Sequence, residues 1–183
     1  MSKHYMYLIL IFSLQNFISG QVMGKPFNTL ENIIQEQPYI PIGETTFSIL
    51  FWDVYTSKLL TTTGNYPIQT DKDKLLYQIN YLTNISGKDL VNSTVEQWQY
   101  LGIEPELYAA YLPVLHKIWP DIEEGDSLSL YVNNNKSVFY FNNNLIGEIN
   151  QPEFSQLFLD IWLSEKTSEP KLRLELLGIK NDK

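Results

Sequence analysis

The last third of the chain carries the pattern that most limits its possible folds, because strand and helix signals follow one another there in a fixed order. Short apolar segments at residues 128–132, 138–141 and 145–149 are separated by two runs of asparagine. Asparagine tolerates positive φ at low cost and therefore suits tight hairpin turns. A proline at position 152 then introduces a helix over residues 153–163. We expect antiparallel strands followed by a helix that packs on them.

Three further strand signals lie earlier in the chain, at residues 45–51, 52–61 and 75–82. The first is rich in Thr, Phe and Ile, and the second either continues it or folds back after a bulge. Side chains of residues 75–82 alternate between two faces, and one face carries Leu75, Tyr77, Ile79 and Tyr81. This alternation predicts a strand with one fully buried face.

Helix signals form separate runs between and after these strands. A short helix is expected over residues 29–35, and a long one over 87–101, for which Ser86 is a good N-cap. A further helix over 105–119 should be kinked by its internal proline, and a final amphipathic helix should cover 171–177. Because strands and helices occur in runs rather than alternating one by one, the pattern predicts an α+β fold.

The first twenty residues have the pattern of a signal peptide. An apolar run over residues 5–14 follows a basic residue, and Ser19-Gly20 supplies small residues before Gln21. A retained anchor is the alternative, but the apolar run is much shorter than the ~20 residues that cross a bilayer. We predict cleavage after residue 20, export to the periplasm or the medium, no stable membrane insertion afterwards, and a single domain over residues 21–183.

Composition excludes several classes of function. The chain has 13 Lys and Arg against 21 Asp and Glu, a net charge of −8, so it lacks the basic face that nucleic acids require. It has no cysteine, and His116 is the one histidine outside the predicted signal peptide, so a thiolate or histidine metal site is not expected. The acidic residues at 121–126 lack the ligand spacing of an EF-hand and are interpreted as a solvated turn. We predict neither a metal nor a cofactor.

Stretches from several parts of the chain occur in the order and spacing of a known family. They are GETTFSILFWDVYTSKLL (43–60), YQINYLTNISGKDLVNSTVEQWQYLG (77–102), IWPDIEEGDSLSL (118–130), FYFNNNLIGEINQPEFSQLFLDIWLS (139–164) and the final SEPKLRLELLG. With them the chain resembles the chalcone isomerase-like family, and in particular its bacterial exported members. The resemblance implies an open-faced β-sandwich, in which a curved antiparallel sheet has helices packed on one face and a ligand cleft lies between the layers.

The resemblance also implies where chemistry would lie. The family's enzymes cyclise chalcones with an arginine on the strand that corresponds to residues 45–51, because a fixed cation stabilises the developing oxyanion. That strand has no arginine here, and the assisting tyrosine, asparagine and threonine correspond to Leu90, Gln97 and Ile161. The fatty-acid-binding relatives also hold their carboxylate with an arginine and a tyrosine. We therefore predict no catalytic residues, and expect Arg173 to complement a helix C-terminus.

The many aromatic side chains have two interpretations. Packed in a core, they need only a partner for each polar tip. If some line a cleft, the walls suit a hydrophobic or planar small molecule. We predict Tyr55, Tyr81 and Trp98 as ligand-binding residues on such a wall.

Three functions follow from these observations. The leading hypothesis is a non-enzymatic exported protein that binds a small apolar ligand, such as an acyl chain, between sheet and helices. The first alternative is an isomerase or lyase with a rearranged active site. The second alternative is a protein-interaction domain whose cleft is filled by its own side chains, with an unknown protein partner.

Overall fold

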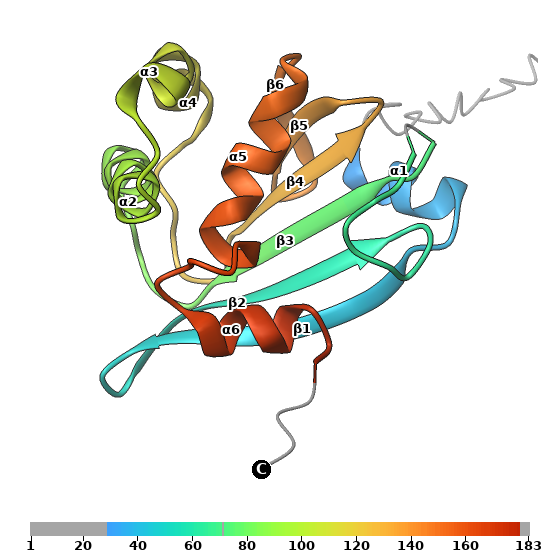
Figure 1. The fold of residues 1–183 in the computed structure, drawn as a ribbon, viewed down its shortest axis with the longest axis horizontal. Coiled ribbons are helices and arrows are strands. Elements are labelled where there is room, and N and C mark those ends of the chain that lie inside the picture. Colours follow the sequence, from blue (N-terminus) through green and yellow to red (C-terminus); the bar gives the residue numbers. More distant parts are fainter. Residues whose placement is uncertain (1–28, 71, 180–183) are drawn as a thin grey trace, which may run out of the picture.

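The computed structural model describes residues 29–70 and 72–179, which form one six-stranded sheet with helices packed on it (Figure 1). The predicted signal peptide lies outside the described residues. No helix within residues 29–70 and 72–179 is long and apolar enough to cross a membrane. In chain order the elements are α1 (Leu30–Glu36), β1 (Ile40–Ile49), β2 (Trp52–Thr61), β3 (Leu75–Tyr81), α2 (Gly87–Tyr100), α3 (Pro105–Tyr108), the 3-10 turn η1 (Ala109–Tyr111), α4 (Leu112–Ile118), β4 (Ser127–Asn133), β5 (Lys136–Phe141), β6 (Asn144–Ile149), α5 (Pro152–Leu163) and α6 (Pro170–Leu176).

The sheet is an antiparallel meander, because its strands lie side by side in the order of the sequence. Its register places Tyr55 opposite Tyr81, and Asn80 opposite Ser127. The β1–β2 turn therefore lies at the same end of the sheet as the end of β3 and the start of β4. The β4–β5 turn lies at the other end.

Alternation along the strands gives the sheet two apolar faces. On β3, Tyr77 and Ile79 join a large core beneath α2, α4 and α5, whereas Leu76 belongs to a small cluster on the opposite face. Leu30 of α1 closes that small cluster, so α1 covers a corner of the second face. The predicted α+β architecture, a curved sheet with a helical layer on one face, is confirmed by this arrangement.

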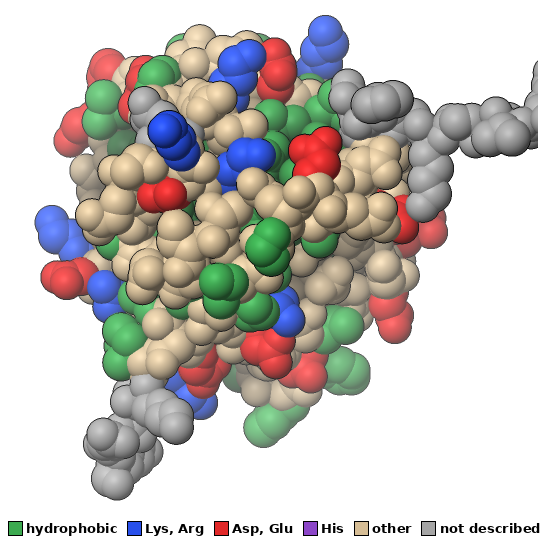
Figure 2. Space-filling model, turned by 90° about the vertical axis from the view of Figure 1, so that its right-hand side faces the viewer, with side chains coloured by type: hydrophobic (Ala, Val, Ile, Leu, Met, Phe, Trp, Pro, Cys, Tyr) green, Lys and Arg blue, Asp and Glu red, His purple; other side chains and the backbone are tan. Residues whose placement is uncertain are grey.

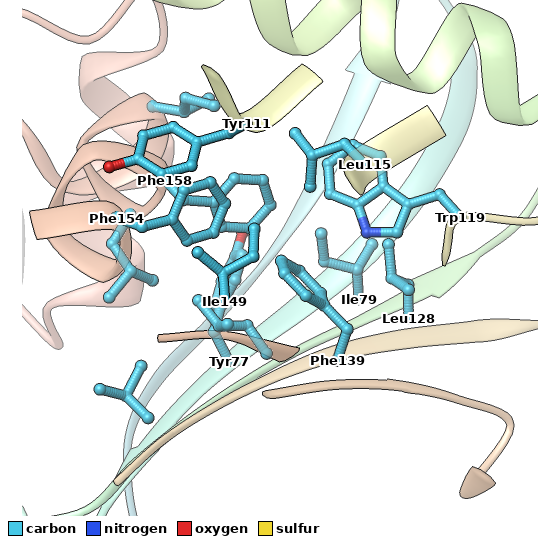
Figure 3. Close-up of a cluster of buried hydrophobic side chains, with 14 of the residues drawn as sticks. Tyr77, Ile79, Tyr111, Leu115, Trp119, Leu128, Phe139, Ile149, Phe154 and Phe158 are labelled. Carbon is cyan, nitrogen blue, oxygen red and sulfur yellow. The ribbon is translucent and has the colours of Figure 1, made fainter. Parts of the chain in front are cut away.

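The large core is dense with aromatic rings beneath the first turns of α5. Figure 3 shows Phe154 and Phe158 of α5 lying against Phe139 of the sheet and against Trp119 and Tyr111. The Tyr111 and Phe154 ring centroids are 4.8 Å apart, and those of Trp119 and Phe139 are 5.5 Å apart, both at steep angles. Such edge-to-face pairs add about 0.5–1.5 kcal/mol each beyond the burial of their area.

Helix α6 lies across the sheet edge at β1. A side chain at Gly43 would place its Cβ 2.1 Å from the carbonyl oxygen of Glu175, so only glycine lets the strand and the helix approach this closely. Thr45, two residues further along the strand, donates a hydrogen bond to the Glu175 carboxylate. This contact fixes α6 against β1.

Two details of the sequence-based expectation were wrong. The helix expected over residues 105–119 is divided into α3, η1 and α4, because Pro113 occupies the first turn of α4, where its missing N–H is not needed. The strand expected over residues 45–51 begins at Ile40 and ends at Ile49, and Leu50 and Phe51 form a two-residue turn into β2.

Candidate functional site

A cavity of about 440 Å³ lies between the sheet and helices α2 and α5. Its sheet wall is formed by side chains of Phe47, Ile49, Val54, Tyr55, Ile79, Tyr81 and Leu128. Its helix wall is formed by Leu90, Ser93, Thr94 and Gln97 of α2 and by Phe158, Ile161 and Trp162 of α5. The volume falls in the range of roughly 300–1,000 Å³ that is typical of small-molecule sites.

The cavity opens to solvent at one end. Its buried wall residues include Ile79, Tyr81 and Ile161, whereas Ile49, Thr83, Ser93 and Glu169 are exposed and line its mouth. We call this exposed set (Ile49, Thr83, Ser93 and Glu169) the mouth residues. Ile49 and Thr83 lie at the end of the sheet that carries the β1–β2 turn, Ser93 lies on α2, and Glu169 directly precedes α6.

Helix α2 presents one face to the cavity because Leu90, Thr94 and Gln97 recur at helical spacing. The start of the helix is fixed by Ser86, whose Oγ accepts a hydrogen bond from the Asp89 amide at 3.1 Å. Thr94 donates its hydroxyl to the Leu90 carbonyl at 2.9 Å, so this buried polar group is satisfied within the helix. The α2 wall therefore combines the apolar Leu90 with Thr94, whose hydroxyl is already bonded, and with the polar Ser93 and Gln97.

Helix α5 is tied to the sheet at the edge of the cavity. The Trp162 Nε1 donates a hydrogen bond to the Tyr55 hydroxyl oxygen at 2.8 Å. Tyr55 acts as the acceptor in this bond, so its own O–H remains able to donate. Tyr55 also stacks on Phe47, with ring centroids 5.1 Å apart. The site thus contains an oriented hydroxyl among aromatic rings.

A second polar hydrogen belongs to Trp119, which follows α4 and also lines the cavity. The Trp119 indole N–H is buried and has no hydrogen-bond partner among the described residues. In Figure 3 its nitrogen lies on the side of the ring towards Ile79 and Leu128, which also line the cavity. A buried donor without a partner loses its hydration without compensation, so an acceptor in the cavity would stabilise it.

The electrostatic environment disfavours negative charge. Burial raises the pKa of Tyr55 to about 12; the hydrogen bond from Trp162 partly offsets this rise, and the Glu169 carboxylate adds to it. Burial also raises the pKa of Tyr81 above its usual range. None of the lining residues that the structure describes is Lys, Arg or His. The cavity can therefore donate hydrogen bonds but has no cation for an anionic ligand.

Comparison with known proteins identifies the fold family. A sequence profile of chalcone isomerase-like proteins matches residues 44–178. The chain belongs to the chalcone isomerase-like family. It is also 25% identical over 138 residues to an uncharacterized protein of Haemophilus influenzae, a match that covers 75% of this chain and 67% of that protein. The crystal structure of an Arabidopsis thaliana fatty-acid binding protein superimposes with a TM-score of 0.57 and 12% identity, covering 76% of this chain and 87% of the other.

The positions that correspond to the chemical residues of the chalcone isomerase-like family surround the cavity here. Phe47 comes from the strand that would carry the arginine, and Leu90, Gln97 and Ile161 line the other walls. Gln97 is engaged, because its Oε1 accepts a hydrogen bond from the Ser168 hydroxyl at 2.7 Å. The positions that the sequence resemblance assigned to the family's chemistry therefore line one cavity, and most of their side chains are apolar.

Arg173 does not reach this space. Its Nε donates to the carbonyl of Leu163, the last residue of α5, at 2.9 Å, and its Nη2 lies 3.8 Å from a Glu165 carboxylate oxygen. It complements a helix C-terminus as expected, although the helix is α5 rather than its own.

The three residues predicted from the sequence as ligand-binding are not all brought together. Tyr55 and Tyr81 line the cavity side by side, with ring centroids 6.1 Å apart. Trp98 instead lies in the core, fully buried, stacked on Tyr108 and donating its Nε1 to the Leu157 carbonyl at 2.9 Å. It shares the core face of α2 with Val91, seven residues earlier, which turns it away from the cavity wall.

Sequence reasoning missed the polar groups at the cavity edge. These groups are Ser168, Glu169 and the hydrogen bond between Trp162 and Tyr55. They come from segments far apart in the chain, so no local sequence motif predicts them. The acidic residues at 121–126 serve turns: Asp121 accepts from the Gly87 amide, and Asp126 accepts from the Glu123 amide. Among the described residues no group of three or more acidic or histidine side chains is placed to hold a metal ion.

Proposed function

We propose that this chain binds a small apolar ligand, such as an acyl chain, in the cavity between the sheet and helices α2 and α5, without catalysing a reaction on it. The observation that carries the proposal is a cavity of about 440 Å³ with largely apolar walls between the sheet and the helices. The named activity of the Arabidopsis structure, fatty-acid binding, is consistent with it. An unfilled cavity also favours ligand binding over an interaction domain with a filled cleft.

We propose further that the polar end of the ligand is uncharged. Transfer of a carboxylate into an apolar site without a cation is strongly unfavourable. The described lining residues supply the Tyr55 hydroxyl, the Trp119 N–H and the Gln97 amide as neutral partners, and the one charged group among them is the Glu169 carboxylate at the mouth. A glycerol ester or a long-chain alcohol fits this set better than a free fatty acid.

Native mass spectrometry of the purified protein tests the first proposal. The expected result is a population that carries a bound small molecule, released under denaturing conditions and extractable into organic solvent. Protein that is ligand-free and also fails to bind any of the probes below would contradict the proposal.

The class of the head group is tested with three probes of equal chain length: 1-monolauroylglycerol, dodecylamine and laurate. Isothermal titration calorimetry should give the lowest Kd for the glycerol ester, with laurate at least about tenfold weaker at pH 7, a difference of about 1.4 kcal/mol. Laurate binding tightest would refute the uncharged head group while leaving apolar ligand binding intact. Absence of binding by all three probes would refute both.

Glu169→Gln sharpens this test. Removing the carboxylate at the mouth should reduce the penalty for laurate and leave the affinity for the glycerol ester within about twofold. Glu165→Gln is a matched control, because Glu165 is exposed and does not line the cavity.

A further inference from the structure

The turn between β1 and β2 exposes four consecutive large apolar side chains. Ile49, Leu50, Phe51 and Trp52 are 55%, 86%, 96% and 77% exposed. We call these four residues the apolar tip. Single exposed apolar residues are common on protein surfaces, but a contiguous group marks an interaction site.

The tip departs from the way this chain builds its other hairpins. The three two-residue turns are Leu50-Phe51, Asn134-Asn135 and Asn142-Asn143, and each contains a residue at positive φ. Asparagine adopts that conformation readily, whereas Leu50 at φ 59° is in a region that large side chains avoid. The need to form a turn therefore does not explain why Leu50 and Phe51 occupy these positions. Contact with an apolar surface outside the molecule would explain it.

The apolar tip is continuous with the mouth of the cavity. Ile49 belongs to both, since it is exposed at the tip and lines the cavity. Figure 1 shows the β1–β2 hairpin projecting at the lower left beyond the helices. Figure 2 shows the opposite end of the molecule, where acidic and basic side chains are interspersed with small apolar groups. The projecting apolar surface is thus next to the opening through which a ligand would pass.

Size and charge point to a lipid surface as the occupant. A stable protein interface needs about 20–30 residues on each side, and the tip offers four on one narrow loop. Tryptophan beside aliphatic side chains is the composition that favours the membrane interface. The next charged residue along the chain is Asp53, whose carboxylate accepts a hydrogen bond from the Ser48 hydroxyl at 2.6 Å, and the chain carries a net charge of −8. An anionic membrane would repel these charges.

We propose that the apolar tip docks the protein on a bilayer of zwitterionic phospholipids and brings the mouth of the cavity to the membrane surface. The contact is peripheral, made by one hairpin turn. It goes beyond the proposed ligand binding, and it is testable without any cavity ligand.

The test uses a polarity-sensitive thiol dye, since the chain has no cysteine and a single introduced one is labelled uniquely. The dye is placed at the tip by Leu50→Cys, or at the opposite end of the sheet by Asn134→Cys, which also lies in a two-residue turn at positive φ. With phosphatidylcholine vesicles, the tip dye should shift to the blue and be quenched by lipid-borne quenchers. The control dye should not respond. Equal response of both dyes, or none from the tip, would overturn the proposal.

The double substitution Leu50→Asn and Phe51→Asn supplies an independent arm. It gives the tip the residues of the other two turns, so folding should be preserved, and vesicle affinity should fall at least about tenfold because two large apolar side chains are lost. Leu107→Ser, at another exposed leucine (61% exposed), should leave vesicle affinity unchanged. All variants share residues 1–28, so any contribution of that segment cancels.

Two results would oppose the proposal in this second arm. One is unchanged vesicle affinity in the double variant. The other is self-association of the wild-type chain that the double variant abolishes and that added vesicles do not reduce. That result would identify the occupant of the tip as a second copy of the chain. Phosphatidylglycerol added to the vesicles should weaken binding or leave it unchanged.

Discussion

The two ends of the space beneath α5 differ in how they are filled. At the first turns of the helix, Phe154 and Phe158 meet Phe139 with ring centroids 5.7–6.1 Å apart, and all three rings are buried. At the last turns, Ile161 and Trp162 face a cavity. One helix and one sheet thus make a packed end of interlocking aromatic rings and a hollow end that holds the cavity.

The largest effect should come from opening the packed end. Phe154→Ala removes a fully buried ring that contacts three aromatic neighbours, so the free energy of unfolding should fall by about 3–5 kcal/mol. Urea denaturation followed by circular dichroism measures this loss.

The same truncation at the hollow end is the matched control. Phe47→Ala removes a partly exposed ring that borders the existing cavity, so its loss should be below about 1.5 kcal/mol. Equal losses at the two positions would show that the ends do not differ in packing.

Filling the hollow end should reduce ligand affinity more than stability. Leu90→Trp projects a larger side chain into the cavity, and the Kd for 1-monolauroylglycerol should rise at least about tenfold while stability changes by at most about 2 kcal/mol. Asn92→Trp, on the exposed side of the same helix, should change neither quantity by a comparable amount. Calorimetry and urea denaturation of the two variants separate the effects.

The sequence predicted the fold better than it predicted the site, for a physical reason. Hairpin turns, helix caps and the apolar faces of helices are determined by a few neighbouring residues. The asparagine turns and the Ser86 cap are therefore predictable from the sequence. The turn at Leu50-Phe51 was missed because neither residue carries a turn signal. The sequence predicts a kink at Pro113 instead of a helix start. Pro113 lies in the first turn of α4 only because the 3-10 turn η1 interrupts the helix before it.

The site depends on which face of each element turns inward, and periodicity alone does not settle this. Tyr55 and Tyr81 reach the cavity because they are opposite each other in the β2–β3 register. Trp98 was placed on the wrong side of α2, although it lies only one residue beyond Gln97, which lines the cavity. The polar edge at Ser168 and Glu169 is brought there by the segment between α5 and α6, which the sequence did not link to the cleft.

A smaller effect concerns the bond that joins the two layers at the hollow end. Tyr55→Phe removes the acceptor for the Trp162 N–H, so the free energy of unfolding at pH 7 should fall by about 1 kcal/mol. Retention of full stability would indicate that the bond contributes nothing net. Tyr100→Phe is the control, because Tyr100 is 63% exposed.

The smallest effect is a change in alkaline stability. The pKa of Tyr55 is raised on folding, from its usual value near 10 to about 12, so the folded state holds this proton more tightly. The stabilisation of the folded state by this tighter proton binding is complete below about pH 10 and is lost as the pH rises towards 12. In Tyr55→Phe the free energy of unfolding should fall less steeply between pH 10 and 11.5. The difference in slope should correspond to at most one proton per molecule. An unchanged slope in urea titrations would contradict the assigned shift.

Whether the hollow end binds an apolar ligand is decided by a calorimetric titration of the wild-type chain with 1-monolauroylglycerol below its aggregation concentration. We expect saturable one-to-one binding with a negative change in heat capacity, as is typical of burial of apolar surface, and at least a tenfold weaker Kd in Leu90→Trp. No saturable heat, or the same Kd in the wild type and Leu90→Trp, would contradict it.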